Sequence, residues 1–96
     1  MTGIGKIYFN ALNDVTSAGE KLKNEINISY NKFMTWKNYC DSVINLILQS
    51  NYSKQQEYYN FKMQTEFRFG TNYQAQLLEY LYYIEKLKVA ILNSMI

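Results

Sequence analysis

The sequence predicts an all-α fold of two long antiparallel helices that form a helical hairpin, in a single domain spanning residues 1–96. Proline is absent and glycine occurs only four times, so residues that interrupt helices are scarce. Apolar residues recur at alternating spacings of three and four, as on one face of a helix. No run rich in Val, Ile and Thr alternates with a period of two, so strands are not expected.

The first helix is expected at about residues 4–49. Its apolar seam, the row of residues at heptad spacing, begins with Ile4, Tyr8, Ala11, Val15, Ala18 and Leu22. After a shift of one turn it continues through Ile26, Tyr30, Phe33, Cys40, Ile44 and Ile47. Charged residues lie on the other faces, so the pattern predicts that the seam packs against a second helix.

A turn at about residues 50–53 leads to the second helix, expected at about residues 53–95. Ser50 and Asn51 are common turn formers, and Ser53 followed by Gln56 fits a capping box, in which each side chain satisfies a free backbone N–H of the other residue. The second seam is Gln56, Tyr59, Met63, Phe67, Gly70, Tyr73, Leu77, Leu81, Ile84, Lys88, Ile91 and Met95. Two seams joined by one short turn predict the hairpin.

Two places could subdivide these helices. The stretches "SAGE" at residues 17–20 and "TNYQ" at residues 71–74 also fit the capping-box pattern, with Gly19 within the first and Gly70 just before the second. Glycine inside a helix costs about 1 kcal/mol relative to alanine. Breaks at these sites would give three or four helices.

Residues that carry enzymatic and metal chemistry are scarce. The chain has no histidine and one cysteine, Cys40, which lies on the apolar seam and has no base to activate it. Glu79 and Glu85 are six residues apart and do not share a helix face. The stretch "TGIGK" at residues 2–6 lacks the preceding strand and the full spacing of a phosphate-binding loop. We therefore expect no catalysis, no metal, no cofactor and no small-molecule substrate.

Charge and hydropathy argue against nucleic acid and membrane as direct partners. The ten basic and eight acidic residues are scattered, which does not favour nucleic-acid binding, although tyrosines could stack on single-stranded bases. The N-terminus lacks the features of a cleaved signal peptide. Glu79, Glu85, Lys86 and Lys88 interrupt the C-terminal apolar segment, so we expect membrane contact only through an assembly.

The C-terminal segment at residues 77–96 has more apolar surface than a hairpin can cover. Fourteen of its twenty residues are apolar or tyrosine. One face holds Leu77, Leu81, Ile84, Ile91 and Met95, and outside it lie Leu78, Tyr82, Val89, Leu92 and Ile96. We expect other chains to cover this helix. The predicted interface residues are Phe67, Tyr73, Leu77, Leu81, Ile84, Val89, Ile91 and Leu92.

The pattern "EYYNFKMQTEFRFGTNYQAQLLEYL", followed by a hydrophobic helix, resembles the second helix of type III secretion needle and inner-rod subunits. The upstream "YFNALNDVTSAGEKLKNEI" is similar to the first helix of such subunits or of the flagellar rod-base protein. The matching positions are Tyr59, Lys62, Met63, Phe67, Asn72, Tyr73, Leu77 and residues 84–96. Between its helices the chain has "QSNYS" where needle subunits usually carry a proline-containing loop.

This resemblance implies a small bacterial structural subunit that is exported without a cleaved signal and stacks with copies of itself in the cell envelope or outside the cell. The alternative is a helical adaptor, secretion chaperone or immunity-type protein that covers a different protein, with a cytoplasmic location. In either case a carboxylate at Ile91 is expected to disrupt contacts between chains and to leave the hairpin largely helical.

Overall fold

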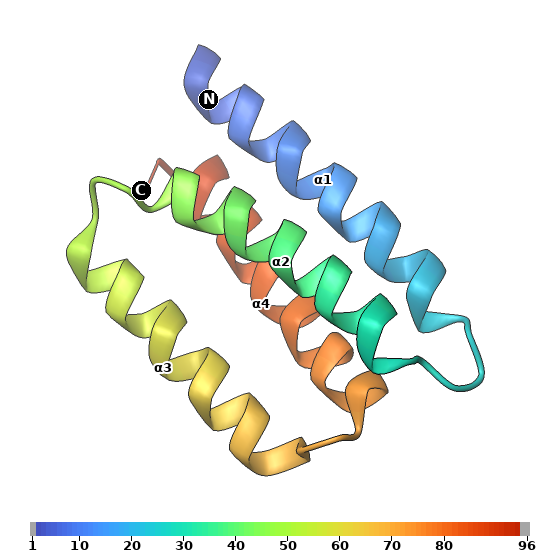
Figure 1. The fold of residues 1–96 in the computed structure, drawn as a ribbon. Helices are drawn as coiled ribbons and strands as arrows, with labels where there is room; N and C mark the ends of the chain where they lie inside the picture. The colour runs from blue at the N-terminus through green and yellow to red at the C-terminus, as the bar shows by residue number, and fades with distance from the viewer. Residues whose placement is uncertain (1, 95–96) are drawn as a thin grey trace.

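The computed structural model describes residues 2–94, which form four helices and contain no strand: α1 (Gly3–Lys23), α2 (Tyr30–Ile47), α3 (Tyr52–Phe69) and α4 (Tyr73–Leu92) (Figure 1). The all-α prediction is confirmed, but the two-helix hairpin is wrong. Met95, the last residue of the second predicted seam, and Ile96, which was predicted to lie off that seam, are outside the described residues.

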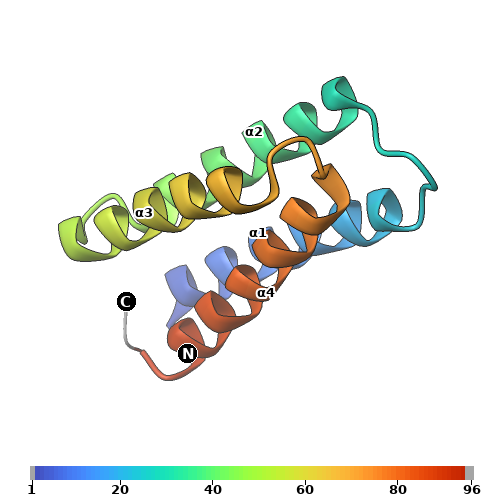
Figure 2. The same ribbon diagram turned by 90° about the horizontal axis from the view of Figure 1, so that it is seen from below.

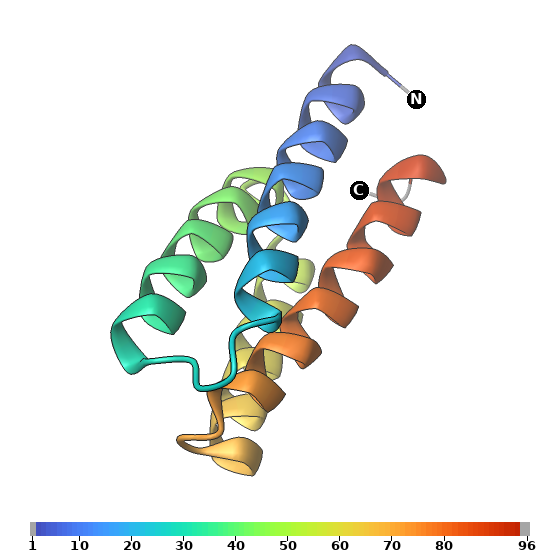
Figure 3. The same cartoon turned by 90° about the vertical axis from the view of Figure 1, so that its right-hand side faces the viewer.

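The helices form a compact bundle with principal extents of 39 × 24 × 17 Å, in which consecutive helices run antiparallel (Figure 1). Seen from below, α2 and α3 lie in one layer and α1 and α4 in the other (Figure 2). Helix α1 packs against both α2 and α4, and α4 also packs against α3. The first turns of α1 project beyond the end of α4 (Figure 3), where Ile4 and Ile7 are exposed.

The predicted helix at residues 4–49 is divided at residues 24–29. Ser29 begins α2 by accepting a hydrogen bond from the backbone N–H of Lys32 at 3.2 Å, and the Lys32 ammonium pairs with Glu25 at 2.6 Å across the turn. Ile26, a predicted seam residue, is 90% exposed in this turn. The side-chain cap satisfies a free N–H at the new helix start, which stabilises the break without proline or glycine.

Gly19 lies inside α1, so the possible break at residues 17–20 does not occur. A Cβ atom at this position would lie 2.8 Å from Cδ2 of Leu81 and 3.0 Å from the ring of Trp36. The glycine therefore allows the close approach of α1 to the side chains of α2 and α4.

The turn predicted at residues 50–53 is present, and so is the possible break at residues 71–74, so the single helix expected at residues 53–95 is divided. Compared with the capping patterns, α3 begins two residues earlier and α4 one residue later. Asn51, not Ser53, caps α3 by accepting a hydrogen bond from the N–H of Lys54 at 3.0 Å. Asn72 caps α4 in the same way, from the N–H of Ala75 at 3.1 Å. Gly70 ends α3 with a φ of +52°, a conformation that favours glycine.

The core is built from all four helices, and its largest buried side chains are Tyr58, Tyr80, Phe33, Leu12, Ile44, Leu48, Leu77 and Ile84. Trp36 donates its indole N–H to the Val15 carbonyl at 3.0 Å, which joins α2 to α1 inside the core. The seam predicted for residues 77–91 is buried as expected. The seam predicted for α3 is not, because Tyr59, Met63 and Phe67 face solvent while Tyr58 and Thr65 are buried.

Candidate interaction surfaces

Four of the predicted interface residues lie in the core of the chain itself. Leu77, Leu81, Ile84 and Ile91 are buried among side chains of the other helices. The prediction assumed that α4 has a single helical partner, whereas α1, α2 and α3 all pack against it. These four side chains are therefore covered without a second chain, and the other four lie on two surfaces.

The first surface is the outer stripe of α4, defined by Leu78, Tyr82, Val89 and Leu92, which are 48%, 62%, 55% and 52% exposed. With the exposed residue Glu85 between Tyr82 and Val89, their spacing alternates by four and three, the spacing of a coiled-coil seam. Val89 and Leu92 belong to the predicted interface. Helix α4 thus has one apolar face in the core and a second one in solvent.

Charged residues accompany the outer stripe of α4. Glu85 pairs with Lys88 at 3.0 Å, and the Lys86 ammonium lies 4.5 Å from the centre of the Tyr82 ring. Glu79 and Lys86 are one heptad apart on the same flank of the stripe. Glu79 and Lys86 therefore place an acidic and a basic group at separate positions along one flank of the stripe.

The second surface is an open groove between α2 and α3, with a volume of about 560 Å³. Its lining residues are Tyr30, Phe33, Met34, Lys37, Met63, Glu66, Phe67, Gly70, Thr71, Tyr73 and Gln76. Tyr73 stacks on Phe33 with ring centres 5.2 Å apart, and Tyr30 packs on Tyr73 at 5.8 Å. Two predicted interface residues, Tyr73 and Phe67, thus lie in this groove, and Phe67 is 95% exposed.

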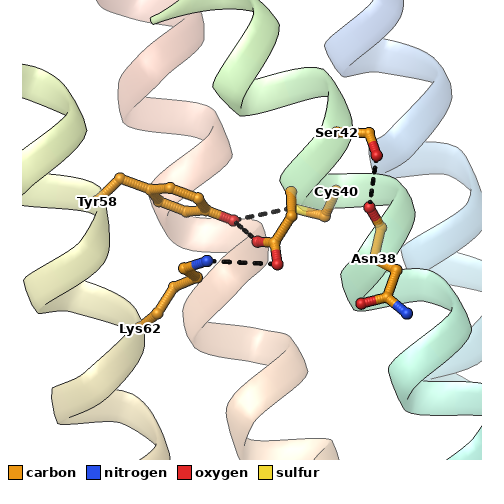
Figure 4. Close-up of polar contacts among 6 residues, drawn as sticks. Asn38, Cys40, Ser42, Tyr58 and Lys62 are labelled. Atoms are coloured by element: carbon orange, nitrogen blue, oxygen red, sulfur yellow. Dashed lines mark hydrogen bonds and ion pairs between the residues drawn. The ribbon is translucent and has the colours of Figure 1, made fainter.

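A polar cluster joins α2 to α3 beyond this groove (Figure 4). The Tyr58 hydroxyl donates to Oδ1 of Asp41 at 2.5 Å, and the Lys62 ammonium pairs with Oδ2 of the same carboxylate at 3.3 Å. The sulfur of Cys40 lies 3.9 Å from the Tyr58 hydroxyl. Both partners of Asp41 come from α3, so the cluster fixes which face of α3 meets α2.

Cys40 is fully buried, as its place on the apolar seam predicted. Burial raises the pKa of its thiol from 9.0 to about 12, although the hydrogen bond with Tyr58 acts in the opposite direction. A thiol held in its protonated form is a poor nucleophile and a poor metal ligand. The geometry therefore gives Cys40 a role in packing.

We expect the protein to lose stability as the pH rises above about 9. Between pH 9.0 and about 12 the Cys40 thiol keeps its proton in the folded chain and loses it in the unfolded chain, so the unfolded state binds fewer protons. The free energy of unfolding then falls by about 1.4 kcal/mol per pH unit for this one group. Urea unfolding measured at several alkaline pH values checks the slope. The Cys40→Ala variant should show a shallower slope near pH 9 to 10, and an equal slope would contradict the assignment.

The described residues contain no group of three or more Cys, Asp, Glu or His side chains placed to hold a metal ion. None of the four helices combines the length and hydropathy needed to cross a membrane.

Comparison of the chain with protein-family models, with curated proteins and with solved structures found no match.

Proposed function

We propose that this protein is a structural subunit that associates with copies of itself through the outer stripe of α4. The observation that carries the proposal is the heptad spacing of four half-exposed apolar side chains on a helix whose other face is already in the core. Large contiguous apolar patches on a small protein mark interaction sites. The stripe from Leu78 to Leu92 is about 21 Å long, enough for two heptads of helix pairing.

A second copy of the chain can cover this stripe if the two α4 helices pair antiparallel about a two-fold axis. In such a pair Leu78 lies opposite Val89 of the second copy, and each contact occurs twice. Tyr82 lies opposite Glu85 of the second copy, so its hydroxyl can donate to that carboxylate. Glu85, which already pairs with Lys88, thereby gains a second hydrogen-bond partner when the stripe is covered.

The charges beside the stripe also support this arrangement. The antiparallel pairing brings Glu79 of one copy close to Lys86 of the other, and the two-fold axis repeats the pair. Opposite charges across an interface favour the correct orientation and disfavour others. In a parallel pairing this flank of each helix would face the opposite flank of the other copy, so Glu79 and Lys86 would not meet.

Self-association agrees with the resemblance to type III secretion needle and inner-rod subunits, which stack with copies of themselves. The four-helix bundle differs from the two-helix hairpin that the apolar seams predicted. The proposal therefore rests on the stripe of α4, and a role in a secretion apparatus is an extension of it that the resemblance alone supports.

Sedimentation velocity tests the proposal by comparing the native chain with a Val89→Asp variant. Val89 is half exposed, so the variant should fold, but each dimer would bury two new carboxylates in an apolar contact. We expect the dissociation constant to rise about a hundredfold or more. Ile26→Asp is the matched control, because it places the same charge at an exposed apolar residue in the α1–α2 turn and should change nothing.

Two outcomes would contradict the proposal. A native chain that stays monomeric at high concentration shows that α4 has no self-contact. A stable complex with a different protein, together with a monomeric purified chain, shows that the stripe serves an adaptor of the alternative class.

A further inference from the structure

The groove between α2 and α3 holds an unusual arrangement: an almost fully exposed phenylalanine stands on its rim. Phe67 belongs to the last turn of α3 and is 95% exposed, beside Met63 on the same helix. Across the groove lie the side chains of Tyr30 and Met34 on α2. An apolar ring and an apolar groove of this size are thus neighbours on one surface, where neither covers the other.

The interior of the groove suits an aromatic ring. Phe33 and Tyr73 are stacked, and Tyr30 is tilted against Tyr73 by 57°. An inserted ring can therefore contact both the faces and the edges of these rings. Aromatic pairs prefer such offset and edge-to-face contacts. Met34 and Met63 have flexible, polarizable side chains that adapt to an inserted group.

We propose that this groove is a second self-association site, in which Phe67 of one copy enters the groove of another copy and receives that copy's Phe67 in return. A ring and its receptor on the same surface form a self-complementary patch, which is the requirement for a two-fold interface. The contact removes both phenylalanine rings from water.

Charge supports a second copy as the occupant. Lys37 on α2 and Glu66 on α3 both line the groove. Neither forms an ion pair within residues 2–94. When the two-fold axis exchanges the α2 and α3 walls, Lys37 of each copy meets Glu66 of the other, and both charges find partners at the edge of the apolar contact.

This inference goes beyond the α4 contact, since it concerns a different surface and does not require that contact. If both interfaces form, each copy has two different two-fold contacts. Copies then build an extended array or a closed ring instead of stopping at a dimer.

A charge-exchange experiment tests the groove in the Val89→Asp background, in which the α4 contact is removed. Sedimentation velocity is measured for this background alone and with Lys37→Glu, with Glu66→Lys, or with both. Each single substitution places like charges across the interface and should weaken dimerisation about tenfold or more. An equimolar mixture of the two single variants should form heterodimers, because each of their contacts then joins opposite charges.

A second variant tests the ring itself. Phe67→Ser in the same background should raise the dissociation constant about a hundredfold, because each dimer contains two inserted rings. Since Phe67 is exposed, its replacement should leave the fold unchanged, which circular dichroism checks.

Several results would overturn the inference. Dimers that persist in Phe67→Ser show that the ring is not inserted. If the double variant recovers association and the mixture of single variants does not, Lys37 and Glu66 interact within one chain. A monomeric Val89→Asp background shows that the groove forms no contact. If the α4 proposal fails instead, the Val89→Asp variant associates as strongly as the native chain. The two failures therefore give different results.

Discussion

An Ile91→Asp variant is expected to lose its cooperative fold. Ile91 is only 6% exposed and belongs to the core contributed by α4. Placing a carboxylate there without a partner costs several kcal/mol, unless the group protonates. The total stability of a domain is about 5 to 15 kcal/mol, so a small bundle is expected to unfold or to melt far below the native chain. Thermal unfolding followed by circular dichroism measures this loss.

Leu92→Asp is the matched control, since it introduces the same charge at the next residue. Leu92 is 52% exposed on the outer stripe of α4. This variant should keep the helix content and melting temperature of the native chain and lose self-association through the outer stripe of α4. A folded, stable Ile91→Asp protein would contradict the assignment of Ile91 to the core and would restore the sequence-based expectation that this residue lies between chains.

Tyr58→Phe is expected to destabilise the bundle, whereas Tyr80→Phe is not. Both hydroxyls are buried, but Tyr58 donates to the Asp41 carboxylate, while the Tyr80 hydroxyl has no partner among the protein atoms of residues 2–94. A hydrogen bond to a charged group contributes about 1.5 to 3 kcal/mol, and a buried unpaired hydroxyl costs about 1 to 3 kcal/mol. Tyr58→Phe should therefore lose stability and Tyr80→Phe should keep or gain it.

Urea unfolding of the two variants and the native chain measures these differences in the free energy of unfolding. The comparison requires that this free energy falls with urea concentration at a similar slope in all three proteins. The two substitutions remove the same atom from buried tyrosines, so each serves as the control for the other. Equal losses of stability would show that the pairing of Tyr58 with Asp41 does not distinguish the two sites.

The helical class could be predicted from the sequence because spacing and the lack of proline are local features. The number of helices could not be predicted in the same way. The turn at residues 24–29 contains no proline or glycine, and apolar residues keep their approximate spacing across it. The Ser29 cap marks the start of α2, but the contacts that hold α2 back on α1 are tertiary, since the Trp36 indole donates to the Val15 carbonyl.

The orientation of α3 could not be predicted from the sequence either. Aromatic side chains occupy two of its faces, with Tyr58 and Phe61 on one and Tyr59 and Phe67 on the other. The first face enters the core because Tyr58 finds an acceptor in Asp41, seventeen residues away on another helix. Sequence spacing shows both faces but not this partner, so the exposed position of Phe67 could not be foreseen.

The two faces of α4 were better predicted. The sequence separates the row of Leu77, Leu81, Ile84 and Ile91 from Leu78, Tyr82, Val89 and Leu92, and the structure buries the first set and exposes the second. The sequence did not show that three helices of the same chain would cover the first set. As a result the predicted interface included residues of the core.

Disulfide formation between copies tests whether the outer stripes of α4 pair antiparallel. A chain carrying Cys40→Ala, Leu78→Cys and Val89→Cys is mildly oxidised and compared with the two chains that carry only one of the surface cysteines. Positions 78 and 89 lie about 16 Å apart along one helix, too far for a bond within a chain. Antiparallel pairing predicts covalent dimers for the chain with both cysteines and few for either single variant. Absence of dimers in all three, or equal dimer yield from the single variants, would contradict it.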